Sequence, residues 1–262
     1  MDLGLRDRTA VITGGTSGIG LASARTFLRE GAYVAICGRN AERLDAAVKS
    51  LSTEGEVRIL AKSCDVTKAD VVKAFAAAVE AWRGKADSLV NNAGQGRMTT
   101  FATTTDEMWR EELDLKFFSQ IHPVRAFLPL LEKSDAAAIL TVNSLLALQP
   151  EPYMVCTSAA RAGVQSLVKS LATEFAPRIR VNSVVLGLID SGQWERRFQA
   201  REDKSQSRKD WIEKLAASKH SPFRRLGEPD EVARSIVYLS SPAAGYVTGA
   251  SLEISGGVSR FI

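Results

Sequence analysis

The sequence predicts an α/β fold, a doubly wound arrangement with a seven-stranded parallel sheet and helices on both faces. Two observations predict it: seven short apolar runs alternate with longer segments of helical period, and no change of composition divides the chain. A chain of 262 residues with 45% apolar and 24% charged residues can bury a large core in one unit. We therefore expect a single domain over residues 1–262.

The candidate strands are short apolar runs of the kind that become buried. They lie at Thr9–Thr13, Tyr33–Cys37, Val57–Ala61, Ser88–Asn92, Ala138–Asn143, Arg180–Leu186 and Ser251–Ser255. The helices between them have recognisable starts, such as Asn40 before Ala41–Leu51 and Pro229 before Asp230–Leu239. Further helices are expected over Lys68–Trp82 and Asp106–Glu132. In such folds ligands bind at the carboxyl ends of the strands.

The segment of residues 192–222 interrupts the alternation. It contains no candidate strand, and Trp194, Phe198 and Trp211 recur in it among many charges. This mixture predicts one or two amphipathic helices that form a lid over the site. Its basic residues are interpreted as a solvated face of the lid rather than as a nucleic-acid site. They are Arg196, Arg197, Arg201, Lys204, Arg208 and Lys209.

Composition and charge argue against several classes of protein. The net charge of +4 comes from basic residues scattered among acids, so we expect no nucleic-acid partner. No run of apolar residues is long enough to span a membrane, and the start of the chain has no secretory pattern, so we expect a cytoplasmic protein without a membrane partner. Cys37, Cys64 and Cys156 are odd in number and widely spaced, which favours buried thiols over disulfides and indicates no metal site.

A glycine-rich turn follows the first predicted strand. Gly14, Gly18 and Gly20 lie where strand becomes helix, so the backbone can approach a pyrophosphate and present helix N–H groups to it. This turn indicates a Rossmann-type nucleotide site. With Asn91-Asn92-Ala93-Gly94 after the fourth strand, it resembles the motifs of the short-chain dehydrogenase/reductase (SDR) family.

The resemblance covers nearly the whole chain and implies a set of cofactor-binding residues. That set is Gly14, Thr16, Ser17, Gly18, Ile19, Gly20, Arg39, Asp65, Val66, Asn92, Ala93, Gly94, Arg161, Gly187 and Ile189. Gly38 occupies the position where an acidic residue would bind the ribose hydroxyls of NAD, and Arg39 beside it offers a fork suited to a 2′-phosphate. This pair predicts NADP as the cofactor. The alternative is that Arg39 is an ordinary surface arginine.

The catalytic positions depart from the family pattern. The family has Asn, Ser, Tyr and Lys, whereas the corresponding positions here hold Lys116, Ser144, Thr157 and Arg161. A threonine hydroxyl is too short and too weakly acidic to replace a phenol, and arginine does not release its proton near neutrality. The resemblance therefore implies a catalytic site that lacks the Tyr-x-x-x-Lys pair.

Lys116 is the new ionisable group in this set. If it faces Ser144 and lies near Arg161, burial and the neighbouring positive charge would lower its pKa and make it a usable acid. Alternatively, Lys116 fills a vacated polar site or binds a backbone carbonyl. Tyr153 is a second candidate, as a displaced phenol or as a wall of the substrate pocket.

The resulting hypothesis is an NADP(H)-dependent oxidoreductase that acts on a carbonyl or alcohol and has an altered proton-transfer site. Met98, Leu145, Leu146 and Tyr153 are expected to line the pocket, which favours a moderately apolar small molecule. By resemblance we expect a homodimer or homotetramer. The alternatives are a non-catalytic NADP-binding sensor or scaffold, and a lyase or isomerase that uses Lys116 in acid-base chemistry.

Overall fold

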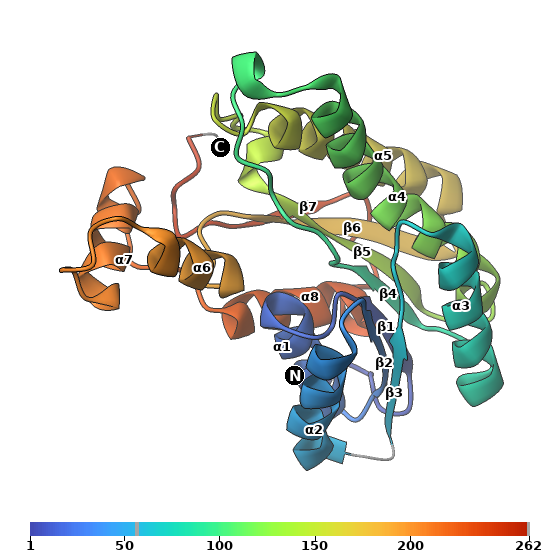
Figure 1. Ribbon diagram of the computed structural model, residues 1–262. Coiled ribbons are helices and arrows are strands. Elements are labelled where there is room, and N and C mark those ends of the chain that lie inside the picture. Colours follow the sequence, from blue (N-terminus) through green and yellow to red (C-terminus); the bar gives the residue numbers. More distant parts are fainter. Residues whose placement is uncertain (56–57, 261–262) are drawn as a thin grey trace.

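The computed structural model describes residues 1–55 and 58–260, which form a three-layer α/β fold around one parallel sheet (Figure 1). The strands are β1 Thr9–Thr13, β2 Tyr33–Gly38, β3 Ile59–Ser63, β4 Ser88–Asn91, β5 Ala137–Ser144, β6 Ile179–Leu186 and β7 Ser251–Ile254. The predicted seven-stranded parallel sheet is confirmed, with the order β3-β2-β1-β4-β5-β6-β7. The predicted third strand began at Val57, which lies outside the described residues.

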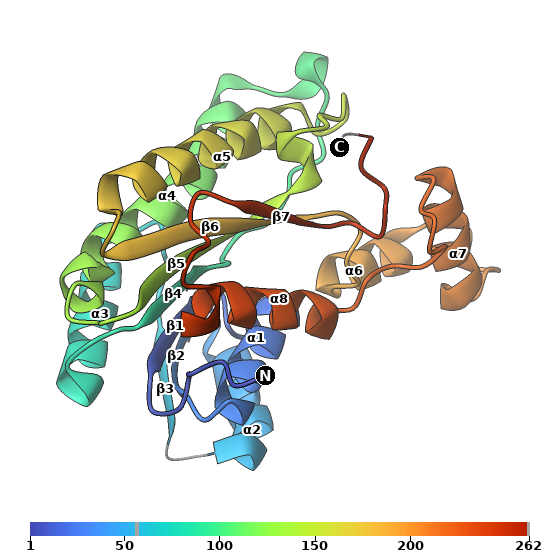
Figure 2. The same ribbon diagram turned by 180° about the vertical axis from the view of Figure 1, so that it is seen from behind.

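Helices cover both faces of the sheet (Figures 1 and 2). The first face carries α1 Gly18–Arg29, α2 Ala41–Gly55 and α8 Pro229–Ser240. The second carries α3 Ala69–Arg83, α4 Asp106–Leu131 and α5 Val155–Phe175. Two apolar clusters fill the interfaces: Phe27 and Ile236 belong to one, and Phe75 and Phe127 to the other. The alternation of apolar strands and amphipathic helices in the sequence is what produces these two cores.

The order of the strands fixes where a ligand can bind. The chain runs outward from β1 to β3 and then returns to place β4 on the other side of β1, so the connections after β1 and β4 leave in opposite directions. In doubly wound sheets the crevice at this switch point, beside the carboxyl ends of the strands, is the usual ligand site. The glycine turn after β1 and Asn92 after β4 both lie at this edge.

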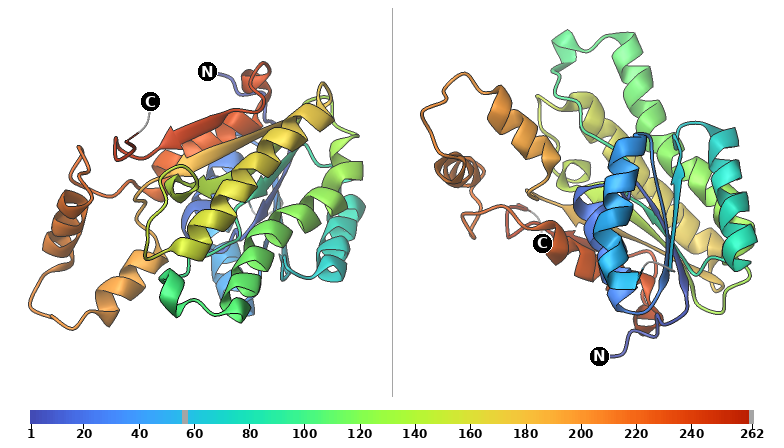
Figure 3. Two further views of the ribbon diagram at one scale, coloured as in Figure 1. Left: turned by 90° about the horizontal axis from the view of Figure 1, so that it is seen from above. Right: turned by 60° about the horizontal axis from the view of Figure 1, so that its bottom comes forward.

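The predicted lid contains two helices, α6 Gly192–Ala200 and α7 Arg208–Ser218. They stand out from the body of the domain beside the carboxyl edge of the sheet (Figures 1 and 3). The ring of Trp211 lies 6.2 Å from that of Trp194 and 5.6 Å from that of Phe198, so the aromatic residues hold the two helices together. In the described part of the chain, none of the helices is long and apolar enough to cross a membrane.

Candidate active site

The glycine turn has the backbone geometry that a phosphate-binding loop needs. Gly14 and Gly18 have φ values of +66° and +51°, which favour glycine, and a Cβ at Gly20 would collide with the carbonyl oxygen of Gly14. The side-chain amide of Asn92 donates to the carbonyl oxygens of Thr13 and Gly14 at 3.0 Å each. The loop after β4 is thereby fastened to the turn after β1.

The turn opens into a central cavity of about 620 Å³ that extends from Gly14 to Lys219 on the lid side. All the predicted cofactor-binding residues except Gly20 line this cavity, and Gly20 packs against the turn itself. The catalytic candidates Ser144, Thr157, Arg161 and Tyr153 line it too. So do the expected pocket walls Met98, Leu145 and Leu146.

One end of the central cavity contains a pair of arginines. Arg39 lines it, and so does Arg43 in the first turn of α2, which sequence reasoning missed although it lies four residues after Arg39. A Cβ at Gly38 would lie 2.6 Å from Cγ2 of Thr16, so this position has no room for an acidic side chain unless Thr16 moves. This end of the cavity therefore presents cations where an NAD-binding site would present a carboxylate.

Lys116 is buried, with 3% of its surface exposed, and its ammonium group lies beside a carboxylate. Nζ is 2.8 Å from Oε1 of Glu112, one helical turn earlier on α4, and it donates to the carbonyl oxygen of Gln95. Burial and the charge of Arg161 lower its pKa to about 8, although Glu112 opposes the shift. The lowered pKa has the causes expected from the sequence, and the contact with the Gln95 carbonyl is the one that the sequence offered as the alternative. The ion pair with Glu112 was not anticipated.

Glu112 joins Lys116 to Thr157, the residue at which the family resemblance predicts the tyrosine position. The Thr157 hydroxyl donates to Oε1 of Glu112 at 2.5 Å and accepts from the backbone N–H of Arg97 at 3.0 Å. Glu112 itself is 2% exposed. Sequence reasoning missed Glu112 because a glutamate on a long helix is usually solvated. The one signal that could have found it is its i, i+4 spacing to Lys116, which places both side chains on the same face of α4.

Ser144 and Arg161 lie on the same cavity but make different contacts. The Ser144 hydroxyl accepts from the backbone N–H of Leu146 at 3.3 Å, which leaves its own proton available for another oxygen. Arg161 is half-buried, and the removal of water from its guanidinium lowers its pKa to about 10. It donates to the carbonyl oxygen of Val142 at 2.8 Å. Its Nε has no hydrogen-bond partner within the described residues.

Lys116 does not border the central cavity directly. Among the described residues, the lining includes Ser144, Thr157 and Arg161 but not Lys116. In the part of the chain that the structure describes, the ammonium of Lys116 contacts Glu112 and Gln95 rather than Ser144. The expected approach of Lys116 to Ser144 is therefore not observed. The connection from Lys116 to the cavity runs through Glu112 and the hydroxyl of Thr157.

Tyr153 occupies the lid side of the cavity. Its hydroxyl is hydrogen-bonded to Nζ of Lys219, and the same ammonium lies 3.1 Å from Oε1 of Glu151. Lys219 follows directly after α7, so this contact ties the lid to the loop that precedes α5.

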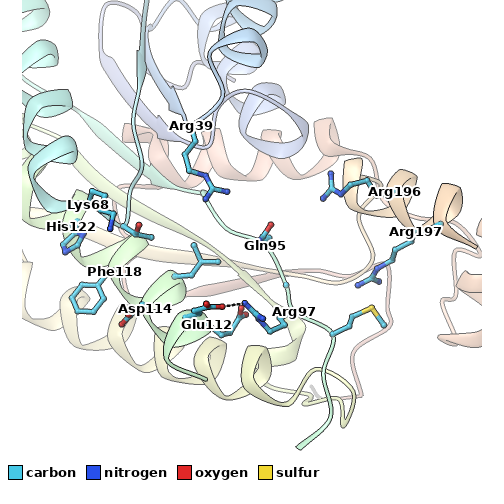
Figure 4. Close-up of a pocket in the computed structure, with 16 residues that line it drawn as sticks. Arg39, Lys68, Gln95, Arg97, Glu112, Asp114, Phe118, His122, Arg196 and Arg197 are labelled. Atoms are coloured by element: carbon cyan, nitrogen blue, oxygen red, sulfur yellow. Dashed lines mark hydrogen bonds and ion pairs between the residues drawn. The ribbon is translucent and has the colours of Figure 1, made fainter. Parts of the chain in front are cut away.

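An outer cavity of about 960 Å³ adjoins the central one (Figure 4). Gln95, Gly96, Met98 and Leu115 line both, as do three arginines, Arg39, Arg196 and Arg197. In the described part of the chain, the His, Cys, Asp and Glu side chains do not form a group that could hold a metal ion.

Comparison with known proteins identifies the family. The profile described as "Enoyl-(Acyl carrier protein) reductase" matches residues 14–259. The chain belongs to the short-chain dehydrogenase/reductase family. Curated SDR relatives include the uncharacterized oxidoreductase YvrD of Bacillus subtilis, which is 33% identical with 99% of each chain covered. The human dehydrogenase/reductase SDR family member 4 is 31% identical over 97% of this chain and 88% of that protein.

Solved structures include a more similar SDR protein. A short chain oxidoreductase from Pseudomonas aeruginosa, described as containing an atypical catalytic center, is 55% identical to this chain. Its apo form has a TM-score of 0.95 with both chains fully covered. Its NADPH-bound form has a TM-score of 0.93 and covers 98% of this chain and all of that one. L-sorbose reductase from Gluconobacter frateurii, complexed with NADPH and L-sorbose, is 33% identical over both full chains with a TM-score of 0.95.

Proposed function

We propose that this SDR protein is an NADP(H)-dependent oxidoreductase that interconverts a carbonyl and an alcohol through a proton path built from Thr157, Glu112 and Lys116. The observation that carries the proposal is the buried chain of contacts from the cavity to Lys116, whose pKa is lowered to about 8. A lysine with such a pKa is a usable acid near neutrality, whereas an ordinary lysine is not.

The residues present fit NADP. The glycine turn is open at Gly18, where no heavy atom lies within 4 Å of the Cβ position. Arg161 lines the cavity, and its Nε has no hydrogen-bond partner within the described residues. Arg39 and Arg43 supply positive charge where a 2′-phosphate requires it. When bound, the cofactor supplies or accepts the hydride. The NADPH complexes of the Pseudomonas and Gluconobacter proteins support this assignment.

The protein supplies the proton and holds the substrate oxygen. Ser144 donates a hydrogen bond to that oxygen. The Thr157 hydroxyl, which is too weak an acid to act alone, turns from Glu112 to the substrate oxygen and passes on its proton in the same step in which it receives one from Glu112. Glu112 in turn takes a proton from the ammonium of Lys116, which ends as a neutral amine. The sum is one proton moved from Lys116 to the new alcohol. Arg161 holds positive charge beside the path and thereby favours release of the proton.

Tyr153 offers a competing proton donor for the same reaction. Its hydroxyl is bonded to Lys219, so the cavity contains a tyrosine and lysine in contact, although at positions other than the family's. We favour Lys116 because the Thr157 hydroxyl stands at the position of the family's tyrosine. Tyr153 instead lies at the lid side, where it suits contact with the rest of the substrate.

The test is NADPH oxidation with a broad panel of aldehydes, ketones and sugars, followed by two variants. Lys116→Ala should lower turnover by about 10²–10⁴, the usual contribution of a positioned acid, and leave the Kd for NADPH close to native. Tyr153→Phe should keep activity. Loss of activity in Tyr153→Phe together with an active Lys116→Ala would assign the proton to Tyr153. If the native protein binds NADPH but oxidises it with no member of the panel, a cofactor-binding sensor is the better description.

A further inference from the structure

Two consecutive arginines on α6, Arg196 and Arg197, line both cavities. The guanidinium carbon of Arg197 lies 4.6 Å from the centre of the Trp194 ring. Arg197 is half-buried, and this burial lowers its pKa. Within the described residues, no carboxylate oxygen lies at ion-pair distance from either guanidinium. The wall of the cavities thus contains two positive charges that the protein does not neutralise directly.

The nearby carboxylates already have other partners. Arg208 on α7 binds Asp190 at 2.7 Å and Glu195 at 2.8 Å, and Lys219 binds Glu151 at 3.1 Å. Arg196 is exposed to water, whereas Arg197 is half-buried, and burying a charge without a partner is unfavourable. The position of Arg197 beside the cavities, with Arg196 next to it, therefore indicates a partner that arrives from outside.

Figure 4 shows that both side chains point from α6 into the opening, toward the segment that carries Gln95 and Arg97. On that opposite wall Arg97 is bound to Glu111 at 2.6 Å. Asp114 is a second exposed carboxylate of the outer cavity, and it lies on the far side of the opening from α6. The space in front of α6 is therefore positively charged and open to a ligand.

We propose that Arg196 and Arg197 bind an anionic group, a carboxylate or a phosphate, carried by the substrate at a distance from its reacting carbonyl. This rests on the proposed function, since it names the substrate class of the same site. The planar fork of arginine fits either anion through two parallel hydrogen bonds. Tyr153 and Lys219, which line the central cavity on the same lid side, add a hydroxyl and a further positive charge nearby.

The phosphates of the cofactor are the other anions that could use these arginines, and the experiment separates the two sources. Protein saturated with NADP⁺ is titrated by calorimetry with 4-oxopentanoate, 6-oxoheptanoate and the methyl esters of both. A second pair is dihydroxyacetone phosphate and dihydroxyacetone. At least one anion should bind about tenfold or more tightly than its neutral counterpart, as charge-assisted hydrogen bonds imply.

The double variant Arg196→Gln, Arg197→Gln should lose that preference while its Kd for NADPH stays within about threefold of native. Lys209→Gln is the matched control, because it removes one charge from an exposed position on α7 that lines neither cavity. The control should keep the preference for the anion.

Three results would overturn the proposal: neutral compounds that bind as tightly as the anions, no binding of any anion, or a double variant that keeps the preference but binds NADPH more than tenfold weaker. The last result would assign the arginines to the cofactor. None of these measurements requires turnover, so a failure here is distinct from an absence of NADPH oxidation, which would contradict the proposed function.

Discussion

The turn after β1 and the surroundings of Lys116, which we propose as the phosphate-binding half and the proton-transfer half of the site, are built in different ways. At the turn after β1, the backbone makes the site: Gly14 and Gly18 adopt left-handed conformations, and Gly20 leaves no space for a side chain. Around Lys116, side chains make the site, through contacts of Glu112 with Thr157 and Lys116. A site made of backbone tolerates little change of sequence. A site made of side chains can be rebuilt if several of them change together.

The charges around Lys116 depend on one another. The buried ammonium of Lys116 is paired with the buried carboxylate of Glu112, and the half-buried guanidinium of Arg161 lies close enough for its charge to act on both. Removing any one partner of a buried charge network leaves the others uncompensated, which is costly. The residues at positions 112, 116, 157 and 161 should therefore be regarded as one unit, and a single return to the family's residue should not restore the ordinary site.

The sharpest test of whether side chains around Lys116 make a proton path is the variant Glu112→Gln. It removes the carboxylate that links Thr157 to Lys116 and that raises the pKa of the lysine. Turnover at neutral pH should fall by about 10² or more, because the proton path is broken. Reduction by the native enzyme needs protonated Lys116, so its rate should decline as pH rises through about 8. In the variant this decline should shift to lower pH. The measurement is kcat against pH from 6 to 10.

Glu111→Gln is the control for that experiment. Glu111 is the adjacent residue, is exposed, and is bound to Arg97 at 2.6 Å. Its loss should leave the pH at which kcat declines unchanged. An unchanged decline in Glu112→Gln, with kcat near native, would contradict the assignment of Lys116 as the acid.

The same difference explains what the sequence could predict. The positions of the strands along the chain and the approximate limits of most of them follow from apolar runs. The strand Thr9–Thr13 was predicted at its observed bounds. Gly14 and Asn92 were found because backbone constraints leave a pattern of residue types. Glu112 leaves no such pattern: its role depends on burial, which arises only when α4 packs beside α5. The orientation of Arg196 and Arg197 toward the cavities was missed for the same reason, since a basic segment alone resembles a solvated face.

The choice between NADPH and NADH tests the cofactor-binding half of the site, and the expected effect is smaller than that of Glu112→Gln. Arg39→Ala should weaken NADPH binding by roughly ten- to a hundredfold, because a charge-assisted contact contributes about 1.5–3 kcal/mol, and NADH binding should hardly change. Calorimetry with both cofactors measures this. Equal affinity of the native protein for NADPH and NADH would refute it. If Arg43 also binds the 2′-phosphate, Arg43→Ala should weaken NADPH binding by a smaller factor and leave NADH binding hardly changed.

The predicted lid, α6 and α7, should respond to the cofactor although it contributes little to the core. Arg208 fastens it to Asp190, and Lys219 fastens it to Glu151, both through partly exposed ion pairs that are individually weak. Amide hydrogens of residues 194–211 should therefore exchange quickly in the apoprotein and more slowly once NADP⁺ fills the cavity. Helix α8, whose Ile236 and Val237 are fully buried, is the internal reference and should exchange slowly in both states. Slow exchange in residues 194–211 of the apoprotein, unaltered by NADP⁺, would mean that this segment is a fixed wall. The cofactor would then enter a cavity that is already formed.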